Sequence, residues 1–370
     1  MDRVSPPPLA GTRIVEFSAI GPVPLAGMLL ADLGADVVRV ERPERGELDV
    51  IPADRRDPVL RGRRTVRADL TDPVVSEHVR QLIDRADVLL EGHRPGAMER
   101  LGIGPDVCCT NNSALIYGRM TGWGQSGPLA RTAGHDINYI AATGALHALG
   151  RRDEPPVVPL NLLGDYGGGA TFLVMGILAA LVERTSSGLG QVIDAAMIDG
   201  VATLLQPVNS WRAAGLWSDD RESNLLDGAA PYYRTYRCAD GRDVAVGAIE
   251  SRFYAVLVTG LGLTTGDLPD RLDRSAWPRL RDVFSTRFAT RSRDDWAAAF
   301  GDSDACVTPV LTFEEAAGHP QLRARGTLHH RHGQLESAPA PRFSRSSAGP
   351  GGTAVPTELD DVLRGWPARR

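Results

Sequence analysis

Short apolar runs alternate with amphipathic stretches over the first 125 residues. Runs typical of buried strands lie at residues 13–17, 36–40, 87–91 and 114–119. Between them, residues 24–33 and 73–85 carry apolar positions at helical spacing, and each stretch begins with proline. Strands that alternate with helices favour a parallel sheet covered on both faces. The pattern therefore predicts the α/β fold class, with a Rossmann-like large domain built on a parallel sheet.

The pattern changes in the second half of the chain. Residues 170–182 form an apolar run that is too short to span a bilayer, so it predicts a buried helix, and a strand follows at 191–197. Residues 230–250 are typical of a β-hairpin around the turn pair Asp240 and Gly241. Helical stretches near 252–262, 277–289 and 293–301 complete a smaller α+β domain.

We place domain boundaries where these patterns change. Residues 1–200 form the large domain, which the C-terminal segment 326–370 completes. Residues 201–227 are a helical linker, and residues 228–325 form the small α+β domain. The segment 333–358 is rich in Pro, Ser, Ala and Gly, so we expect it to follow the surface.

Composition narrows the possible functions. The 370-residue chain carries a net charge of −5, and all 41 of its basic residues are arginine. Without lysine, the protein cannot be a pyridoxal phosphate enzyme, a P-loop NTPase or a protein kinase. With no basic excess and no ladder of aromatic residues, nucleic-acid binding is not expected. Four cysteines without metal-ligand spacing, and a start unlike a signal peptide, predict a reducing, cytoplasmic location without a membrane span.

The loops that follow the predicted strands are rich in Gly, Pro and Arg. They cover residues 18–22, 41–46, 91–96 and 120–127. Ligands of open parallel sheets bind beyond the carboxyl ends of the strands, and Arg donates to two phosphate oxygens at once. The first loop has no GxGxxG pattern, and Pro22 and Pro24 lack the amide hydrogens that a pyrophosphate would need. A phosphate-bearing ligand other than a dinucleotide is therefore favoured.

Three residues are candidates for acid–base chemistry. His135 lies in GHDINY, where a glycine and several polar residues can orient an imidazole. Asp165 precedes three glycines in LGDYGGG; it is either a helix N-cap or a base at a helix start open to a ligand. Glu250 ends an apolar strand, where it is either exposed or a partner for a histidine. The HHxH cluster at 329–332 is more typical of a solvated loop than of a metal site.

Taken together, these segments resemble the family III CoA-transferase superfamily, and within it the α-methylacyl-CoA racemases. The resemblance covers about residues 9–344. Its motifs are LADLGADVVRVERP (30–43), DVLLEGHRPG (87–96), LIYGRMTGWGQSGP (115–128), AGHDINYI (133–140), PLNLLGDYGGG (159–169), SSGLGQVIDAAM (186–197) and ADGRDVAVGAIE (239–250). It implies an interlocked homodimer and a 2-methylacyl-CoA substrate.

The resemblance also implies roles for the three candidates. His135 and Asp165 would remove and return the α-proton on opposite faces of the substrate through an enolate, and Glu250, in the same chain or across the dimer, would orient His135. We expect backbone amides near the start of the Gly-rich helix to hold the enolate oxygen. No metal or redox cofactor is expected, because coenzyme A is part of the substrate.

Residues matching the family's substrate and CoA contacts lie in the loops already described. They are Ile20, Arg42, Ala68, Asp69, Leu70, Thr71, Gly92, Arg94, Arg100, Gly134, Asp136, Ile137, Asn138 and Tyr139. Two positions depart from the family. Val23 stands where racemases often have glycine, and arginines in RGRR (61–64) are expected to replace the lysines sometimes found near the CoA phosphates.

Two other functions remain open. A CoA transferase on the same fold would use Asp165 as a nucleophile that forms a mixed anhydride with the acyl group. His135 and Glu250 favour the racemase, because a transferase needs no such pair. A CoA-binding protein without activity is the third possibility. The sequence does not identify the acyl chain or its pathway.

Overall fold

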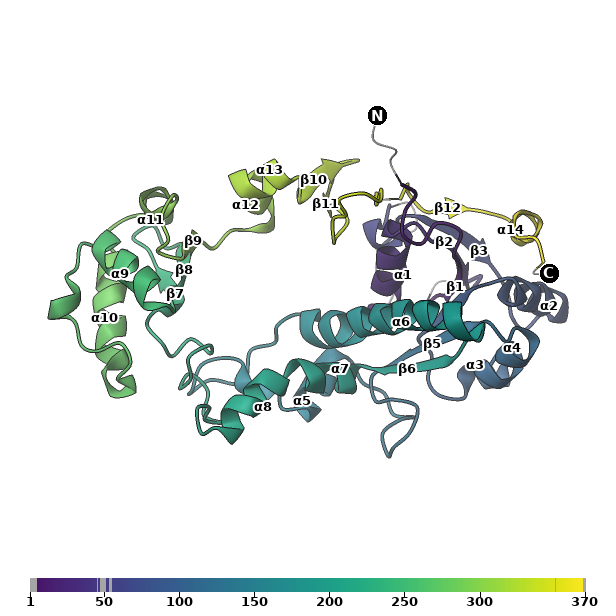
Figure 1. Ribbon diagram of the computed structural model, residues 1–370, viewed down its shortest axis with the longest axis horizontal. Helices are drawn as coiled ribbons and strands as arrows, with labels where there is room; N and C mark the ends of the chain where they lie inside the picture. The colour runs from purple at the N-terminus through teal and green to yellow at the C-terminus, as the bar shows by residue number, and fades with distance from the viewer. Residues whose placement is uncertain (1–4, 45, 47–50, 53–54, 350, 369–370) are drawn as a thin grey trace. The chain divides into compact units, whose positions relative to one another are not determined.

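The computed structural model describes residues 5–44, 46, 51–52, 55–349 and 351–368. The chain divides into two compact units, which are described separately (Figure 1). The first unit comprises Met1–Ala145, Pro159–Leu205 and His329–Arg370. The second comprises Leu146–Val158 and Gln206–Leu328.

A seven-stranded sheet in the order β12-β3-β2-β1-β4-β5-β6 forms the centre of the first unit. Its strands are β1 (Arg13–Phe17), β2 (Asp36–Glu41), β3 (Arg63–Arg67), β4 (Val88–Glu91), β5 (Ile116–Thr121), β6 (Val192–Ala196) and β12 (Val355–Pro356). Every pairing in it is parallel. This confirms the predicted α/β class and five of the strands. The strands β3 and β12 were not predicted, and β12 brings the C-terminal segment to the edge of the sheet.

Helices cover both faces of the sheet, as the alternating pattern predicts. The helices α1 (Pro22–Asp32) and α6 (Thr171–Ser187) pack on one face (Figure 1). The other face carries α2 (Pro73–Asp84), α3 (Ala97–Arg100), α4 (Pro105–Asn111) and α14 (Leu359–Gly365). Local signals set the ends of these helices: the Asp72 carboxylate accepts the Val74 amide hydrogen at 2.8 Å before α2, and Gly188 ends α6 in the left-handed conformation.

A π-helix precedes α6. It is labelled η3 (Leu162–Ala170), and it continues directly into α6. By length and composition alone, Leu162–Ser187 could cross a membrane, with a mean hydropathy of 1.5. The core helix of a water-soluble protein passes the same test, and Leu173 and Ile177 are fully buried among core residues of the sheet. The packing therefore shows that one face of the predicted helix is buried, whereas Met175 and Val182 on its other face are exposed.

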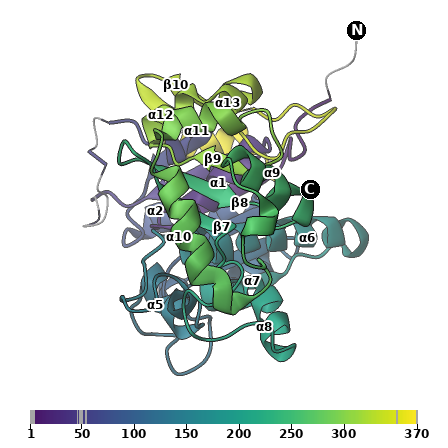
Figure 2. The ribbon, with the colours of Figure 1, turned by 90° about the vertical axis from the view of Figure 1, so that its left-hand side faces the viewer.

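The first unit is completed by the helices α5 (Asp136–Ala142) and α7 (Met197–Leu204) and by a two-stranded sheet of β10 (Leu328–Arg331) and β11 (Gln334–Ser337). Leu328, the first residue of β10, belongs to the second unit. The second unit has an antiparallel sheet of β7 (Tyr233–Arg237), β8 (Asp243–Gly247) and β9 (Val307–Pro309). Its helices are α8 (Gln206–Ala213), α9 (Ser251–Gly260), α10 (Trp277–Phe288), α11 (Arg293–Phe300), α12 (Phe313–Gly318) and α13 (Pro320–Arg325). Figure 2 shows α9 and α10 around β7 and β8. The predicted hairpin and the three helices after it are confirmed.

The two compact units differ from the predicted domains in three places, the smallest being residues 326–328, which belong to the second unit. Residues 146–158 belong to the second unit, and most of the predicted linker, from residue 206 onward, belongs to it as well. Hydrogen bonds explain this: the Arg221 guanidinium donates to the carbonyl groups of Arg151 at 3.1 Å and Glu154 at 2.8 Å. Arg151 also pairs with Glu222 at 2.6 Å. These contacts join two segments about 70 residues apart, which no local pattern shows.

Candidate active site

Loops from the carboxyl ends of several strands gather at one edge of the large sheet. A Cβ placed on Gly92, after β4, would stand 2.9 Å from Val23 Cγ2 and 3.0 Å from Ala19 Cβ, so the loop after β1 packs on the loop after β4. Burial and the neighbouring charge of Arg42, after β2, both lower the pKa of His93. The structure therefore brings Ile20, Arg42 and the loop that carries Arg94 to one edge.

His135 and Asp165 lie close together beside this edge. His135 is exposed and immediately precedes α5, while Asp165 is half-buried in η3. Burial is the main cause that raises the pKa of Asp165, and the negative charge of Asp136 adds to it. A hydrogen bond from Asn161 Nδ2 to Asp165 Oδ2 at 3.0 Å and the charge of His135 act in the opposite direction. A carboxyl group with a raised pKa is suited to proton transfer near neutral pH.

The loop after β1 makes room for the Asp165 side chain. Gly21 has a φ of 69°, and a Cβ at this position would stand 2.8 Å from Asp165 Oδ2. A larger residue would be strained in its own backbone and would press on the carboxylate. Asn161 was not predicted as a site residue, although its position four residues before Asp165 in a helical segment was a signal that could have identified it.

Asp165 does not cap its helix, so this alternative from the sequence is wrong. The carboxylate at the start of η3 is that of Asp136, whose Oδ2 accepts the amide hydrogens of Gly164 at 2.6 Å and Asp165 at 2.7 Å. These two amides are therefore not free to hold an enolate oxygen, which corrects the expectation for them. The physical reason is tertiary: α5 places a buried acid against the first turn of η3, and a bound carboxylate satisfies helix-start amides well.

The rest of GHDINY builds the wall behind His135. Asn138 Oδ1 accepts the His135 amide hydrogen at 3.0 Å, which fixes the backbone of the histidine. Tyr139 is buried, donates its hydroxyl hydrogen to the Gly134 carbonyl and meets the Trp123 ring edge-on at 4.9 Å. Its side chain therefore packs within the protein, whereas Ile137 is 41% exposed. Burial and the charge of Asp165 raise the pKa of Tyr139, and the charge of Arg94 opposes them, which places Arg94 near this wall.

The candidate coenzyme A residues lie in the loops after β2, β3 and β4. After β3, Ala68 is buried, and Asp69 Oδ1 accepts the Thr71 amide hydrogen at 2.9 Å and its hydroxyl hydrogen at 2.7 Å, with Leu70 between them half-buried. This is a side-chain turn that shapes the loop. Arg42, Arg94 and Arg100 are all exposed, and within the described part of the chain no carboxylate pairs with any of the three.

The arginines of RGRR do not face this edge as free cations, which corrects the expectation that they replace phosphate-binding lysines. Arg61 makes a two-point ion pair with Asp32, at 3.0 and 2.6 Å. Arg63 is fully buried against Glu16 at 3.1 Å. Arg64 pairs with Asp36 at 2.7 Å. The carboxylates that pair with these arginines come from α1, β1 and β2, so the ion pairs hold β3 in the sheet. The strand was not predicted because its charged residues give no apolar pattern in the sequence.

Glu250 belongs to the second unit. It follows β8 and directly precedes α9, where its side chain is exposed and makes no capping hydrogen bond. Burial raises the pKa of Cys306, and the charge of Glu250 adds to the rise, so the two side chains are neighbours. His135 belongs to the first unit and Glu250 to the second, so the orienting role stays a prediction.

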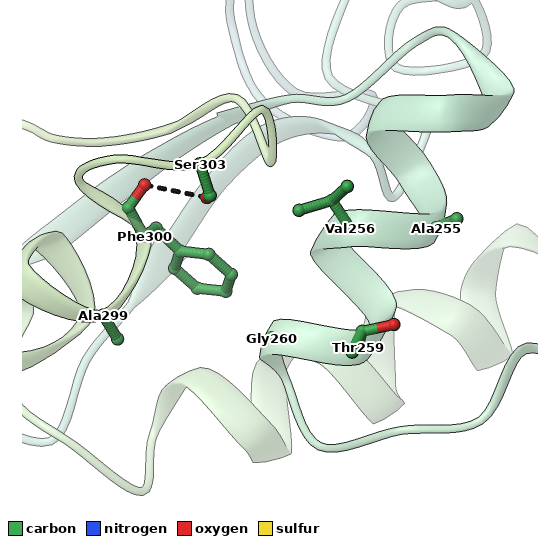
Figure 3. Close-up of a pocket in the computed structure, with 7 residues that line it drawn as sticks. All are labelled: Ala255, Val256, Thr259, Gly260, Ala299, Phe300 and Ser303. Carbon is green, nitrogen blue, oxygen red and sulfur yellow. Dashed lines mark hydrogen bonds between the residues drawn. The ribbon is translucent and has the colours of Figure 1, made fainter.

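Two cavities lie within the second unit. One, of about 370 Å³, opens between α9 and α11 (Figure 3), and its lining is Ala255, Val256, Thr259, Gly260, Ala299, Phe300 and Ser303. The Ser303 hydroxyl donates its hydrogen to the Phe300 carbonyl at 2.8 Å, so this hydrogen is not available to a ligand. The other, of about 570 Å³, lies along the small sheet and includes Cys306 and Gly247. Neither lining contains His135, Asp165 or Glu250.

Metal ligation finds no support in the described ranges. Among those residues, no group of three or more His, Cys, Asp or Glu side chains is placed to hold an ion, and this includes the histidines at 329–332. The four cysteines are free thiols.

The structure has a parallel α/β sheet with His135 and Asp165 beside its carboxyl edge, and comparisons with known proteins identify the family. The profile described as CoA-transferase family III matches residues 9–357, and the chain belongs to this family. It is 45% identical to the α-methylacyl-CoA racemase of Mus musculus over 94% of this chain and 90% of that protein. It is also 45% identical to the α-methylacyl-CoA racemase of Homo sapiens, over 86% of this chain and 82% of that protein.

A solved structure supports the fold. The crystal structure of a CAIB/BAIF family protein from Brucella suis superimposes with a TM-score of 0.81. It is 26% identical and covers 98% of this chain and 99% of its own. The architecture predicted from the alternating pattern is thus the architecture of the family.

Proposed function

We propose that this protein interconverts (2R)- and (2S)-2-methylacyl-CoA thioesters. The observation that carries the proposal is the pairing of His135 with a half-buried Asp165 whose pKa is raised. Similarity to racemases over most of the chain adds to it. Both groups lie beside the loops that hold the candidate CoA residues, so one substrate can reach both.

The reaction moves one proton off the α-carbon and one proton back. In one direction His135 takes the α-proton while the C–H electron pair passes into the thioester to form an enolate, and Asp165 then donates a proton to the opposite face. In the reverse direction Asp165 is the base. A carboxyl group with a raised pKa serves both steps, because its proton affinity is closer to that of a histidine. Glu250, from the same chain or a second copy, orients the His135 imidazole.

Coenzyme A would bind along the loops after β2, β3 and β4. Arg42 and the loop at 68–71 take the nucleotide end, and Arg94 and Arg100 take phosphate groups, since their guanidinium groups are exposed. Gly134, Asp136, Ile137, Asn138 and Tyr139 border the thioester through their backbone. His135 and Asp165 supply the proton transfers, so the proposed reaction uses no metal or redox cofactor.

We propose a homodimer in the cytoplasm. An apolar stripe on the outer side of η3 and α6 supports self-association: Met175 is 57% exposed and Val182 70% exposed, and Leu162 extends the stripe. Exposed apolar patches of this kind mark interaction surfaces. A second copy could also bring its own Glu250 to His135.

The second candidate function is CoA transfer. The family's description favours it, and the half-buried Asp165 could attack a thioester carbonyl, forming an acyl–aspartyl anhydride as the CoA thiolate leaves. The two reactions differ at the α-carbon, because transfer leaves its hydrogen in place.

An exchange experiment in D2O separates the two. The protein is incubated with one epimer of 2-methyldecanoyl-CoA and no acceptor acid, and deuterium and optical purity are measured at the α-carbon. We expect the wild-type protein to incorporate deuterium and to lower the optical purity of the substrate. In His135→Ala and Asp165→Asn, both deuterium incorporation and racemisation should be strongly reduced. His78→Gln, at a half-buried position, and Asp106→Asn, at an exposed one, are matched controls that should behave as wild type. Transfer of CoA to an added carboxylate with a protiated α-carbon would overturn the racemase.

A further inference from the structure

We propose that Asp136 is a positioning residue, whose side chain holds the backbone of Asp165 in place against His135. This inference rests on the proposed function. It gives Asp136 a part beyond the backbone contact with substrate that the family resemblance implies. The residue is next to His135 in the sequence and bonded to Asp165 in space, so it joins the two proton-transferring groups.

The geometry of the contact is specific. One oxygen, Asp136 Oδ2, accepts both the Gly164 amide hydrogen at 2.6 Å and the Asp165 amide hydrogen at 2.7 Å. The side chain is almost fully buried, at 5% exposure. Gly164 is packed on it, since a Cβ there would stand 2.5 Å from the same oxygen. Two short charge-assisted hydrogen bonds in a buried place fix a backbone firmly.

The two catalytic candidates are thus held by neighbouring residues of one helix turn. Asn138 accepts the amide hydrogen of His135, and Asp136 accepts the amide hydrogen of Asp165. The first turn of α5 therefore sets both backbones. Proton transfer depends steeply on such placement, because a displacement of about 1 Å can cost about a hundredfold in rate.

Asp136 also acts on Asp165 through its charge. Asp136 Oδ1 is buried and has no hydrogen-bond partner among the described residues, so the carboxylate is only partly compensated. Its charge raises the pKa of Asp165. The other charged or titratable groups that act on Asp165 are His135, which lowers this pKa, and Tyr139, which lies near Arg94. A buried carboxylate with one oxygen left without a hydrogen bond is costly for stability, which is consistent with a functional reason for it.

Two substitutions separate the effect of the hydrogen bonds that Asp136 accepts from the effect of its negative charge. Asp136→Asn keeps a carbonyl oxygen that can accept both amide hydrogens but removes the charge, whereas Asp136→Ala removes both. We expect Asp136→Ala to lower kcat for α-exchange by about tenfold or more, with KM changed far less. We expect Asp136→Asn to retain most of that kcat. In the direction in which Asp165 removes the proton, the acidic limb of the kcat/KM profile should move to lower pH, because the charge that raises the pKa of Asp165 is gone.

A second measurement does not depend on activity. In protein labelled with ¹³C at aspartate carboxyl groups, the resonance missing in Asp165→Asn belongs to Asp165, and its titration gives the pKa directly. We expect this pKa to fall in Asp136→Asn and to stay as in wild type in the exposed Asp106→Asn. Far-UV circular dichroism checks that each variant is folded.

The outcomes are distinct. Wild-type kcat in folded Asp136→Ala would overturn the positioning role, and an unchanged Asp165 titration in folded Asp136→Asn would overturn the action of the charge. A large rise in KM with an unmoved pH limb in Asp136→Asn would make the side chain a substrate contact, which also overturns it. If wild-type protein shows no α-exchange, the proposed function fails, while the carboxyl titration still decides whether Asp136 acts on Asp165.

Discussion

Two groups of arginines in the first unit have the same chemistry and opposite surroundings. The paired arginines, Arg39, Arg61, Arg63 and Arg119, are buried and each contacts a carboxylate. The edge arginines, Arg42, Arg94 and Arg100, are exposed at the carboxyl ends of β2 and β4 and in α3. The two groups differ in their position in the sheet. Arginines within or beside the strands contact carboxylates of neighbouring elements. Arginines beyond the strand ends lie at the carboxyl edge, where we propose that coenzyme A binds.

The comparison changes what the absence of lysine means. Arg39 and Arg63 share the fully buried Glu16, and Arg119 bridges Glu91 and Glu99 at 3.0 and 2.9 Å. Such sites need several hydrogen-bond donors in a fixed plane, which arginine supplies and lysine does not. Arginine therefore serves as a structural residue inside the sheet and as a candidate phosphate ligand outside it.

The largest effect is expected at Arg63. Because Arg63→Ala leaves Glu16 in a buried place with one cation instead of two, we expect the free energy of unfolding to fall by about 3–5 kcal/mol. Urea denaturation measures the loss. A loss below about 1 kcal/mol would show that burial does not make the paired arginines more important for stability than the edge arginines.

The next effect is a pH dependence at Glu91. Burial raises the pKa of Glu91 to about 7, against an ordinary value of 4.5, despite its bonds to the His93 amide and Arg119. The folded protein then binds a proton that the unfolded chain releases, so this contribution to stability is full below pH 4.5 and is lost as pH rises through 7. The total is about 3 kcal/mol for a shift of this size.

Glu91→Gln tests that dependence. Its stability should rise relative to wild type between pH 5 and 8, because the variant has no carboxyl group to ionise there. Denaturation curves at several pH values measure the difference, and subtraction removes the titrations that both proteins share. Parallel curves for the two proteins would show that Glu91 titrates normally.

Substitution of the edge arginines is expected to have smaller effects, and these effects should be on substrate binding and not on folding. Arg42→Ala, Arg94→Ala and Arg100→Ala should each raise KM for the acyl-CoA by about tenfold, the cost of one charge-assisted hydrogen bond. Their midpoints of thermal unfolding should match wild type, since no carboxylate partner in the described structure is left unpaired. Normal CoA affinity in all three variants would show that the nucleotide lies elsewhere.

The smallest effect is expected at Arg64. It is paired with Asp36, yet both side chains are partly exposed, and such pairs contribute about 0–1 kcal/mol. Arg64→Ala should therefore unfold almost as wild type does, and its KM should not change. A loss as large as that in Arg63→Ala would mean that pairing alone, without burial, sets the energy.

Much of the fold follows from local pattern. The strands β1, β2, β4, β5 and β6 and the helices α1, α2, α6, α9, α10 and α11 were predicted because apolar residues recur at their natural spacing. The strand β3 was missed because Arg63, Arg64 and Arg67 hide its alternation, and the partners of Arg63 and Arg64 lie in other elements. The site was predicted as a set of candidate residues, but the hydrogen bonds that the amides of Gly164 and Asp165 donate to the Asp136 carboxylate join positions about 28 residues apart and left no local signal.

The sequence by itself determined the α/β class, the residues suited to proton transfer and the exclusion of lysine chemistry, because these depend on residue type and short spacing. Only the tertiary structure decided which arginines are buried and that Asp136, not Asp165, caps η3. Only the tertiary structure brought His135 and Asp165 together. Such outcomes depend on which groups meet across the fold, and burial then sets their charge and pKa. A pattern along one chain does not contain that information.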